Sequence, residues 1–485
     1  MVAALAADAE WMVRGGAVLA AALGAAVGSF VNVVAYRLPR GLSVVRPRRS
    51  FCPACERPIR AGDNVPILGW LRLGGRCRDC GAPIDIVYPL VETLTAIVFV
   101  LLWDGLFVGR VLRNTGDPAA DWPAALAFAT LFAGLMASAV MDIREYLIDV
   151  RVTNAVMAAG IVCHALWGAV NRDPVSQRFG PTTASVGAAL LLGWLGTSAL
   201  ARVLDRRRRP AAEPSEPGGE PDATGVEAAA RANNDEAGDA AIPGPAWSVW
   251  LALATLIALV VVVATSAGAS GWALGPVHQR GAAGIFVLLV ASIAAGMQPR
   301  PSDEAVLAVI HAEQPQARTT ALRELAWLLP SIGLAGATLV TFVGCGWTGA
   351  SWSGPTLWLG DRGAAAMAGA GSAAASMMLA AAVGWFVRIF FTLLFGKEAY
   401  GIGDIYLMAA IGAVGGLWLA LISFFLGAVL ALVGVAAFAL RKRARALPFG
   451  PWLALGALGG LWVHDGLVEY FGRSISGLRS MLAGG

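Results

Sequence analysis

The sequence is poor in charged residues. Only 14% of its residues are charged and the net charge is +4, while 57% are hydrophobic and the mean hydropathy is +0.66. A chain this apolar cannot place its side chains in one soluble core, so the scarcity of charge excludes an ordinary soluble protein and predicts a membrane protein. The small net charge gives no reason to expect a nucleic-acid partner.

Cysteine and histidine are also scarce. Six cysteines among 485 residues are too few for a secreted disulfide scaffold. The four histidines lie far apart, and none has a serine or cysteine context that suggests a catalytic triad: His164, His278, His311 and His464. The sequence therefore disfavours a hydrolase that relies on a nucleophilic triad.

Long apolar runs recur from end to end, each near the roughly 20 residues that a helix needs to cross the hydrocarbon core. They predict an all-α polytopic membrane protein with about 9 to 12 transmembrane helices. The first run lacks a clearly basic region before it, which favours a retained helix over a cleaved signal peptide. We expect about twelve spans, at residues 16–36, 86–107, 123–141, 150–169, 183–203, 247–266, 281–297, 326–344, 365–395, 405–417, 418–440 and 449–468.

Arginine crowds three loops between these runs. The loop 37–85 holds ten Arg against four acidic residues, and further basic runs occupy 206–209 and 441–445. Because positively charged loops stay in the cytoplasm, all three are expected there, and twelve crossings would satisfy this with both termini outside.

The chain divides into six predicted parts. The segment 205–246 has almost no large apolar residues and is expected to be a disordered cytoplasmic linker. A short surface helix or a plain loop is expected between residues 300 and 324. The parts are a first transmembrane helix 1–36, a cytoplasmic four-cysteine zinc-binding domain 37–85, a membrane core 86–204, the linker 205–246, an inserted segment 247–362 with extra apolar spans, and a second membrane core 363–470.

Four of the cysteines form two C-x2-C pairs in the arginine-rich loop, separated by 21 residues: Cys52, Cys55, Cys77 and Cys80. Each pair can turn two thiolates toward one ion, and four thiolates close a tetrahedral zinc site without an open position for catalysis. Two disulfides or free thiols are weaker alternatives in a reducing cytoplasm. Cys163 and Cys345 lie in or beside apolar runs and are interpreted as packing residues.

Two aspartates stand at the predicted cytoplasmic ends of spans. Asp142 follows an apolar run, and Asp404 ends the motif Gly401-Ile402-Gly403-Asp404 before another run. A lone aspartate at a membrane boundary is usually a solvated helix end, but two on the same face form a candidate catalytic pair. Glycines beside an acid allow a peptide backbone to approach it, and two carboxyls in one site share a proton, as an aspartic protease requires.

Asp149 lies seven residues after Asp142, on the same face if the helix continued. It is therefore a rival partner for the pair. We prefer to interpret it as the N-cap of the following span or as a supporting acid, together with Gly401 and Gly403.

Three separated blocks resemble the bacterial type IV prepilin peptidases, a family of bifunctional leader peptidases and N-methyltransferases of the GxGD membrane aspartic protease type. The first block runs from Gly28-Ser29-Phe30 through Asp63-Asn64-Val65-Pro66 to Tyr88-Pro89-Leu90-Val91-Glu92, the second covers 142–149, and the third comprises 401–412 with Pro448-Phe449-Gly450-Pro451. The resemblance covers roughly residues 16–200 and 365–470.

The resemblance implies a specific activity and location. It implies cleavage of type IV prepilin or pseudopilin precursors by Asp142 and Asp404 at the cytoplasmic face of the bacterial inner membrane, in contact with lipid. It also implies methylation of the new N-terminus from S-adenosylmethionine. The chain departs from the family pattern at Ile148, where Pro is usual, at Val87, where Arg is common, and at Tyr406, where Lys is usual.

Two other classes of function remain as alternatives. A non-catalytic scaffold of a pilus or type II secretion assembly could use the cysteine loop to bind a partner, but it would not need both aspartates. A transporter could also use intramembrane aspartates and glycine-broken helices. That interpretation leaves the cysteine loop and the Tyr-Pro-Leu-Val-Glu block unexplained.

Overall fold

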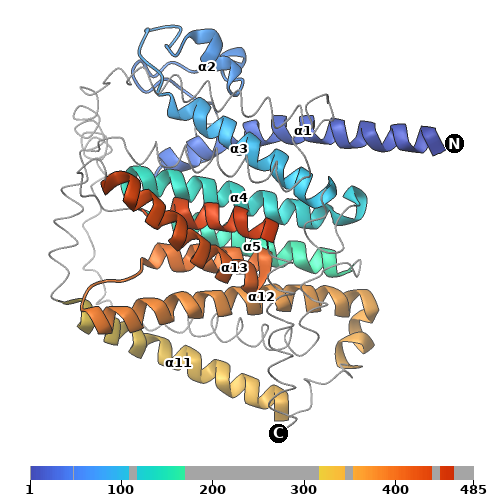
Figure 1. The fold of residues 1–485 in the computed structure, drawn as a ribbon, viewed down its shortest axis with the longest axis vertical. Coiled ribbons are helices and arrows are strands. Elements are labelled where there is room, and N and C mark those ends of the chain that lie inside the picture. Colours follow the sequence, from blue (N-terminus) through green and yellow to red (C-terminus); the bar gives the residue numbers. More distant parts are fainter. Residues whose placement is uncertain are drawn as a thin grey trace, which may run out of the picture.

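The computed structural model is a bundle of long helices with one small loop region at one end (Figure 1). The structure describes residues 2–46, 49–108, 117–169, 316–344, 353–439 and 448–463. The elements are α1 (Val2–Arg37), the 3-10 turn η1 (Ala61–Asp63), α2 (Leu68–Leu73), α3 (Val87–Trp103), the π-turn η2 (Asp104–Val108), α4 (Pro118–Glu145), α5 (Val150–Ala169), α11 (Ala317–Gly344), α12 (Ser353–Phe395) and α13 (Ile402–Ala439). A shorter apolar helix, Gly450–Val463, follows.

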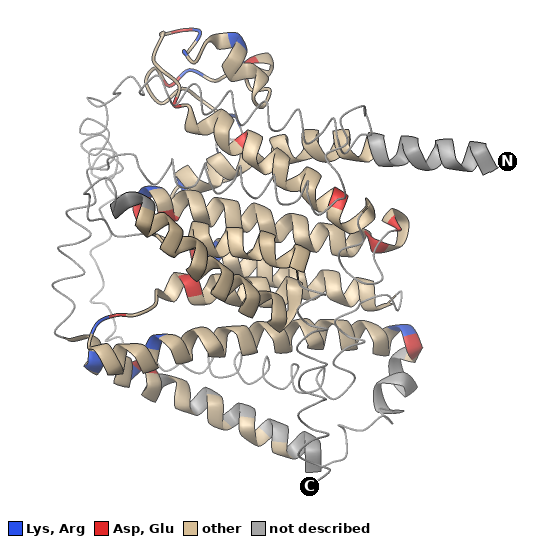
Figure 2. Ribbon diagram, in the orientation of Figure 1, with Lys and Arg blue, Asp and Glu red and all other residues tan. Residues whose placement is uncertain are grey.

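Six of the described helices are long and apolar enough to cross a membrane. This confirms the predicted all-α, multi-pass membrane protein. Charged side chains gather near the helix ends, while the middle of the bundle is largely free of them (Figure 2). The six candidate spans are Gly15–Arg37, Val87–Val108, Pro118–Glu145, Val150–Ala169, Gly360–Phe395 and Ile402–Ala436.

The remaining predicted spans have mixed outcomes. The run at 326–344 lies within α11, which begins earlier, at Ala317. Three predicted spans, 183–203, 247–266 and 281–297, lie outside the described residues, as do the linker 205–246, the basic runs and Cys345. Of the segment 300–324, where a short surface helix or a plain loop was predicted, residues 300–315 lie outside the described residues, and residues 317–324 form the start of α11.

The predicted division between residues 417 and 418 is present one residue earlier, inside α13. Gly416 has φ 83° and ψ 169°, a backbone conformation that favours glycine, so the helix breaks there. The two ends of α13 lie at the same end of the bundle: Gly403 abuts Ile148 after α4, and Gly434 abuts Trp452, two residues beyond Gly450. The chain therefore reverses at Gly416.

Small residues allow the helices to approach closely. A Cβ added at Gly24 of α1 would lie 2.7 Å from the Cα of Ala96 in α3, and one at Gly28 would lie 2.7 Å from the Cα of Glu92. Gly412 of α13 makes a comparable approach to α12, 2.7 Å from the carbonyl oxygen of Ser376. Close backbone contact between small residues is a common way for membrane helices to associate, because lipid supplies little hydrophobic drive for it.

Candidate active site and cysteine cluster

The end of α4 positions Asp142. The helix starts at Pro118 behind Asp117, whose side chain accepts a hydrogen bond from the backbone N–H of Ala119. It ends at Tyr146, which adopts the left-handed conformation (φ 52°) and donates its backbone N–H to the carbonyl of Asp142. Asp142 therefore lies in the last turn, 7% exposed.

A backbone amide from the far end of the chain contacts this carboxyl. The N–H of Gly450 donates to Oδ2 of Asp142 over 2.8 Å. Glycine is required because a Cβ at residue 450 would lie 2.8 Å from the same oxygen. The sequence motif Pro-Phe-Gly-Pro contains this glycine, but the motif alone suggested no role for it.

The first turn of α13 positions Asp404. The residue is 9% exposed, and a Cβ added at Gly401 would lie 2.9 Å from its Oδ2. Its Oδ1 is buried and has no hydrogen-bond partner within the described part of the chain. A side chain at residue 401 would therefore collide with this carboxyl, and the approach of a peptide backbone to Gly401 stays a prediction.

The two aspartates lie at the same end of the bundle and interact electrostatically. Gly403, beside Asp404, contacts the segment that follows α4: a Cβ at residue 403 would lie 2.8 Å from the Cβ of Ile148. Ile148 stands where the resembling family usually has proline. The fold thus brings together two acids that are remote in sequence, although their catalytic roles remain a prediction.

Asp149 has a different environment. Its Oδ1 accepts the backbone N–H of Arg151 over 2.8 Å, the geometry of an N-cap on α5. The Arg151 guanidinium also pairs with it at 2.6 Å, and this hydrogen bonding lowers the pKa of Asp149. The N-cap interpretation agrees with these contacts, and Arg151 in turn donates to the carbonyl of Leu38 at the end of α1.

Tyr400 is a site residue that was missed from the sequence. Its ring is buried against Phe424 and Phe449, with ring centroids 5.7 Å and 5.8 Å away. Burial, together with the nearby Asp404, raises the pKa of Tyr400, so its hydroxyl stays protonated. That hydroxyl has no hydrogen-bond partner among the described residues. The only signal in the sequence is its place directly before Gly401.

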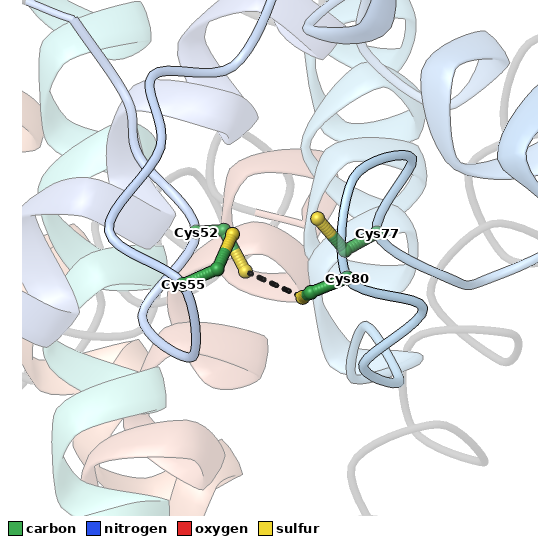
Figure 3. Close-up of side chains that lie close together, drawn as sticks. All are labelled: Cys52, Cys55, Cys77 and Cys80. Atoms are coloured by element: carbon green, nitrogen blue, oxygen red, sulfur yellow. Dashed lines mark hydrogen bonds between the residues drawn. The ribbon is translucent and has the colours of Figure 1, made fainter.

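The four cysteines of the loop between α1 and α3 meet in space. Their Sγ atoms all lie within 4.8 Å of one another, and the side chains of Cys52, Cys55, Cys77 and Cys80 converge from two separate turns (Figure 3). None of the four is in a disulfide. Tetrahedral zinc with Zn–S bonds of about 2.3 Å requires sulfurs about 3.8 Å apart, and the Sγ atoms of Cys52 and Cys80 are separated by 3.9 Å. The cluster can therefore hold a metal such as zinc.

The two C-x2-C turns repeat one backbone pattern. In the first turn, the N–H of Cys52 donates to the carbonyl of Arg57, and the N–H of Glu56 donates to the carbonyl of Cys52. In the second turn, the N–H of Cys77 donates to the carbonyl of Ala82, and the N–H of Gly81 donates to the carbonyl of Cys77. Glu56 and Gly81 both have positive φ. Each turn thus aims two thiols at a common point. Backbone N–H groups of Cys80 and Asp79 also lower the pKa of Cys77 to about 7.

Buried carboxylates anchor this loop. Arg78 makes two hydrogen bonds of 2.7 Å to Asp63, and Arg72 makes a third. These arginines hold the pKa of Asp63 well below its usual range. Glu92 of α3, from the Tyr-Pro-Leu-Val-Glu block, accepts the backbone N–H of Ile67 over 2.6 Å.

Three charged contacts connect the loop to the region that follows Asp142. Arg40 pairs with Glu145 at 2.7 Å, and Arg144 pairs with Asp85 at 3.2 Å. The contact of Arg151 with Leu38 is the third. The cysteine loop and the end of α4 therefore lie at the same end of the bundle. This agrees with the expectation that the loop and Asp142 lie on one side of the membrane.

Comparison with known proteins agrees with this arrangement. Residues 22–104 match the family model described as the bacterial peptidase A24 N-terminal domain. The chain is 36% identical over 199 residues to the type 4 prepilin-like proteins leader peptide-processing enzyme of Escherichia coli O78:H11 (strain H10407 / ETEC), covering 37% of this chain and 67% of that protein.

Two further relatives are named prepilin leader peptidase/N-methyltransferase. The protein of Myxococcus xanthus (strain DK1622) is 39% identical over 140 residues, 29% of this chain and 37% of that one. The protein of Klebsiella pneumoniae is 50% identical over 84 residues, 16% of this chain and 36% of that one. The chain thus spans between about a third and two thirds of the lengths of these relatives, and no solved structure matches it. The extent of the Escherichia coli match, together with the shared N-terminal domain, means that this chain belongs to the prepilin leader peptidase/N-methyltransferase family.

Proposed function

We propose that this protein is a membrane aspartic endopeptidase that removes the leader peptide from type IV prepilin-like precursors. The observation that carries the proposal is the pair of buried carboxyls, Asp142 and Asp404, at one end of the bundle. The names of the relatives support the choice of substrate, because they describe processing of prepilin-like leader peptides.

The proposed chemistry needs two carboxyls that share one proton. The ionised carboxylate takes a proton from a water molecule, whose oxygen attacks the scissile carbonyl carbon, while the protonated carboxyl gives its proton to the carbonyl oxygen. Collapse of the resulting tetrahedral diol breaks the C–N bond: the proton held by the first carboxyl passes to the leaving amine, and a diol hydroxyl returns its proton to the second carboxylate. The Gly450 amide keeps Oδ2 of Asp142 oriented, and the absence of a Cβ at Gly401 lets the Asp404 carboxyl lie against the backbone there.

The second proposed activity is methylation of the new N-terminal amine with S-adenosylmethionine as the donor. Two observations support it. Several relatives have the word N-methyltransferase in their names, and residues 22–104 match the family's N-terminal domain. The donor would supply its sulfonium methyl group to the neutral amine, with loss of one proton.

Zinc is the proposed ion of the cysteine cluster, held by Cys52, Cys55, Cys77 and Cys80. Four thiolates leave no open position, so the ion would act structurally and contribute to folding of a loop too small for a good core of its own. The arginine content of this loop supports a cytoplasmic position for it, and hence for both carboxyls, at the bacterial inner membrane. The division into six parts given above is retained as part of this proposal.

The decisive experiment is co-expression with a prepilin-like substrate, followed by measurement of leader removal. Asp142→Asn and Asp404→Asn should each abolish cleavage, because asparagine keeps the shape of the side chain but cannot exchange the proton. Asp149→Asn is the matched variant, since asparagine also caps helices and should leave most of the cleavage intact. Undiminished cleavage in either of the first two variants would reject the proposed pair.

Methylation has a separate readout. Mass spectrometry of the mature substrate should find its N-terminus heavier by one methyl group when wild-type enzyme and donor are present. A cleaved but unmethylated N-terminus would restrict the enzyme to peptidase work.

A further inference from the structure

Arg388 is a buried charged residue outside the candidate catalytic pair. Arg388 belongs to α12 and is 5% exposed. Its Nε and Nη2 donate to the two carboxylate oxygens of Glu324 on α11, over 2.9 Å and 2.8 Å. Its Nη1 donates to Glu398 and, over 2.6 Å, to the backbone carbonyl of Tyr400. The side chain thus joins α11 to the segment between α12 and α13.

These contacts are specific in geometry. A guanidinium has five N–H donors in a fixed plane, and four of those of Arg388 are directed at defined acceptors. The two parallel bonds to Glu324 form the fork that arginine makes best with a carboxylate. Because burying an unpaired charge is costly, the arrangement favours one position of Arg388, and that position is set by Glu324.

The acceptor at Tyr400 connects this charge cluster to the candidate active site. Tyr400 directly precedes Gly401, so its carbonyl belongs to the stretch of chain that leads into the first turn of α13 and Asp404. The ring of Tyr400 packs on Phe449, and the next residue, Gly450, holds Asp142 through its amide. A displacement of Tyr400 would therefore disturb the surroundings of both carboxyls.

Further contacts hold the same segment. The N–H of Gly396 donates to the carbonyl of Thr392 over 2.8 Å, and the N–H of Ala399 donates to the Thr392 hydroxyl over 3.2 Å. Arg318, in the first turn of α11, lies over Gly396, where an added Cβ would be 3.3 Å from its Nε. The N-terminal turns of α11 therefore contact this segment directly through Arg318 and indirectly through Glu324, which binds Arg388.

Helix α11 lies in the segment that we predicted as an insertion, and no role for it was apparent from the sequence. It runs alongside α12, and charged residues gather at one end of this helix pair (Figure 2). Arg388 and Glu324 pair between the two helices. We propose that α11 is a brace for the active site: Glu324 fixes Arg388, and Arg388 is a positioning residue that holds the Tyr400 carbonyl and so the approach of Asp404 to Asp142. This inference rests on the proposed peptidase function.

The test uses the full chain in membranes or detergent. Glu324→Gln keeps the size of the side chain but breaks the paired fork, since the amide group offers one acceptor and opposes the other donor. The matched control is Arg323→Gln, which removes a charge from the adjacent, exposed position of the same helix. We expect Glu324→Gln to lower kcat for leader removal about 10-fold or more, because small misplacement of reacting groups is costly, with KM nearly unchanged. Arg323→Gln should match the wild type.

An exchanged pair separates positioning from simple stability. The triple variant Glu324→Arg, Arg388→Glu, Glu398→Gln retains an ion pair between α11 and α12, avoids a like-charge contact with Glu398, and removes the Arg388 donor from the Tyr400 carbonyl. It should recover the thermal stability lost in the single variants without recovering kcat. Wild-type kcat in Glu324→Gln, or recovery of kcat by the exchanged pair, would overturn the inference.

Hydrogen exchange supplies a readout that does not depend on cleavage. Amides of residues 396–404 should exchange faster in Glu324→Gln than in wild type or Arg323→Gln. If these amides exchange at the wild-type rate in Glu324→Gln, the proposed bracing role of α11 is rejected, even if kcat falls in that variant. If wild-type protein removes no leader peptide, the proposed function fails, while the exchange rates still decide whether α11 holds this segment.

Discussion

Replacing Gly403 by alanine tests how tightly the two candidate catalytic helices are seated. The new Cβ would lie 2.8 Å from Cβ, 3.0 Å from Cδ1 and 3.2 Å from Cγ1 of Ile148. Carbon atoms in good contact are about 3.5 to 4.0 Å apart, so the first turn of α13 must move away from Ile148 by roughly 0.7 to 1 Å. That movement would carry Asp404 away from the end of α4.

Two opposing effects on stability can be compared. Overpacking a tight contact costs about 1 to 3 kcal/mol, whereas the higher helix propensity of alanine contributes at most about 1 kcal/mol. We therefore expect a modest net loss of stability. The larger effect is on catalysis: a shift of about 1 Å in reacting groups lowers the rate by roughly 100-fold.

The assay is the initial rate of leader removal at saturating substrate, together with the thermal midpoint of the purified protein. Gly15→Ala is the control, since this helical position is exposed and an added Cβ there meets nothing within 4 Å. Changing Ile148 to Gly in the Gly403→Ala background removes every overlapping atom and should restore part of the rate. A Gly403→Ala enzyme with wild-type kcat would refute the close seating of α13 against Ile148.

Three further predictions concern the cysteine loop and Tyr400. Cys80→Ser should lower the metal content of the purified protein and its thermal stability, whereas Cys163→Ser should leave metal content unchanged; equal metal content in the two variants would reject the cluster as a metal site. Asp63→Asn should accelerate hydrogen exchange in the loop 49–85 at neutral pH. Because Arg78 lowers the pKa of Asp63, its contribution is present above the ordinary carboxyl pKa of about 3.9 and is lost only as pH falls below that value, so a wild-type advantage that vanished already near pH 6 would contradict this account. Tyr400→Phe keeps the ring packing and should leave thermal stability unchanged while kcat falls, because the buried hydroxyl has no partner among the described residues and can donate to the bound peptide; a large loss of stability would instead indicate an internal role.

Much of the fold was predictable because the relevant signals are local. The span predicted at 150–169 coincides with α5, Val150–Ala169, and the break predicted after residue 417 is present at Gly416. Hydrophobic length decides the span in lipid, and a glycine in the apolar run allows the break. The bounds of α1 and α4 were less accurate: α1 begins at Val2, well ahead of the predicted span, and α4 extends past its apolar run at both ends.

The candidate site was only partly predictable. Both aspartates were identified from the sequence and Asp149 was interpreted as a helix cap, because short-range rules govern caps and glycine-flanked acids. Tyr400 was missed, since a tyrosine before a glycine motif has many possible environments. The contacts of Arg388 were also invisible, because nothing in one sequence pairs it with Glu324.

The sequence by itself determined the class of protein, the cysteine pairs and the two acids, since composition, C-x2-C spacing and motif glycines act within a few residues along the chain. Tertiary structure alone decided which distant groups meet. The Gly450 amide reaches Asp142, Gly403 seats on Ile148, and Arg388 joins Glu324 to the Tyr400 carbonyl. Each of these contacts joins different elements of the bundle, and they form because helices packed through small residues bring remote polar groups together where a buried donor or charge must find its partner.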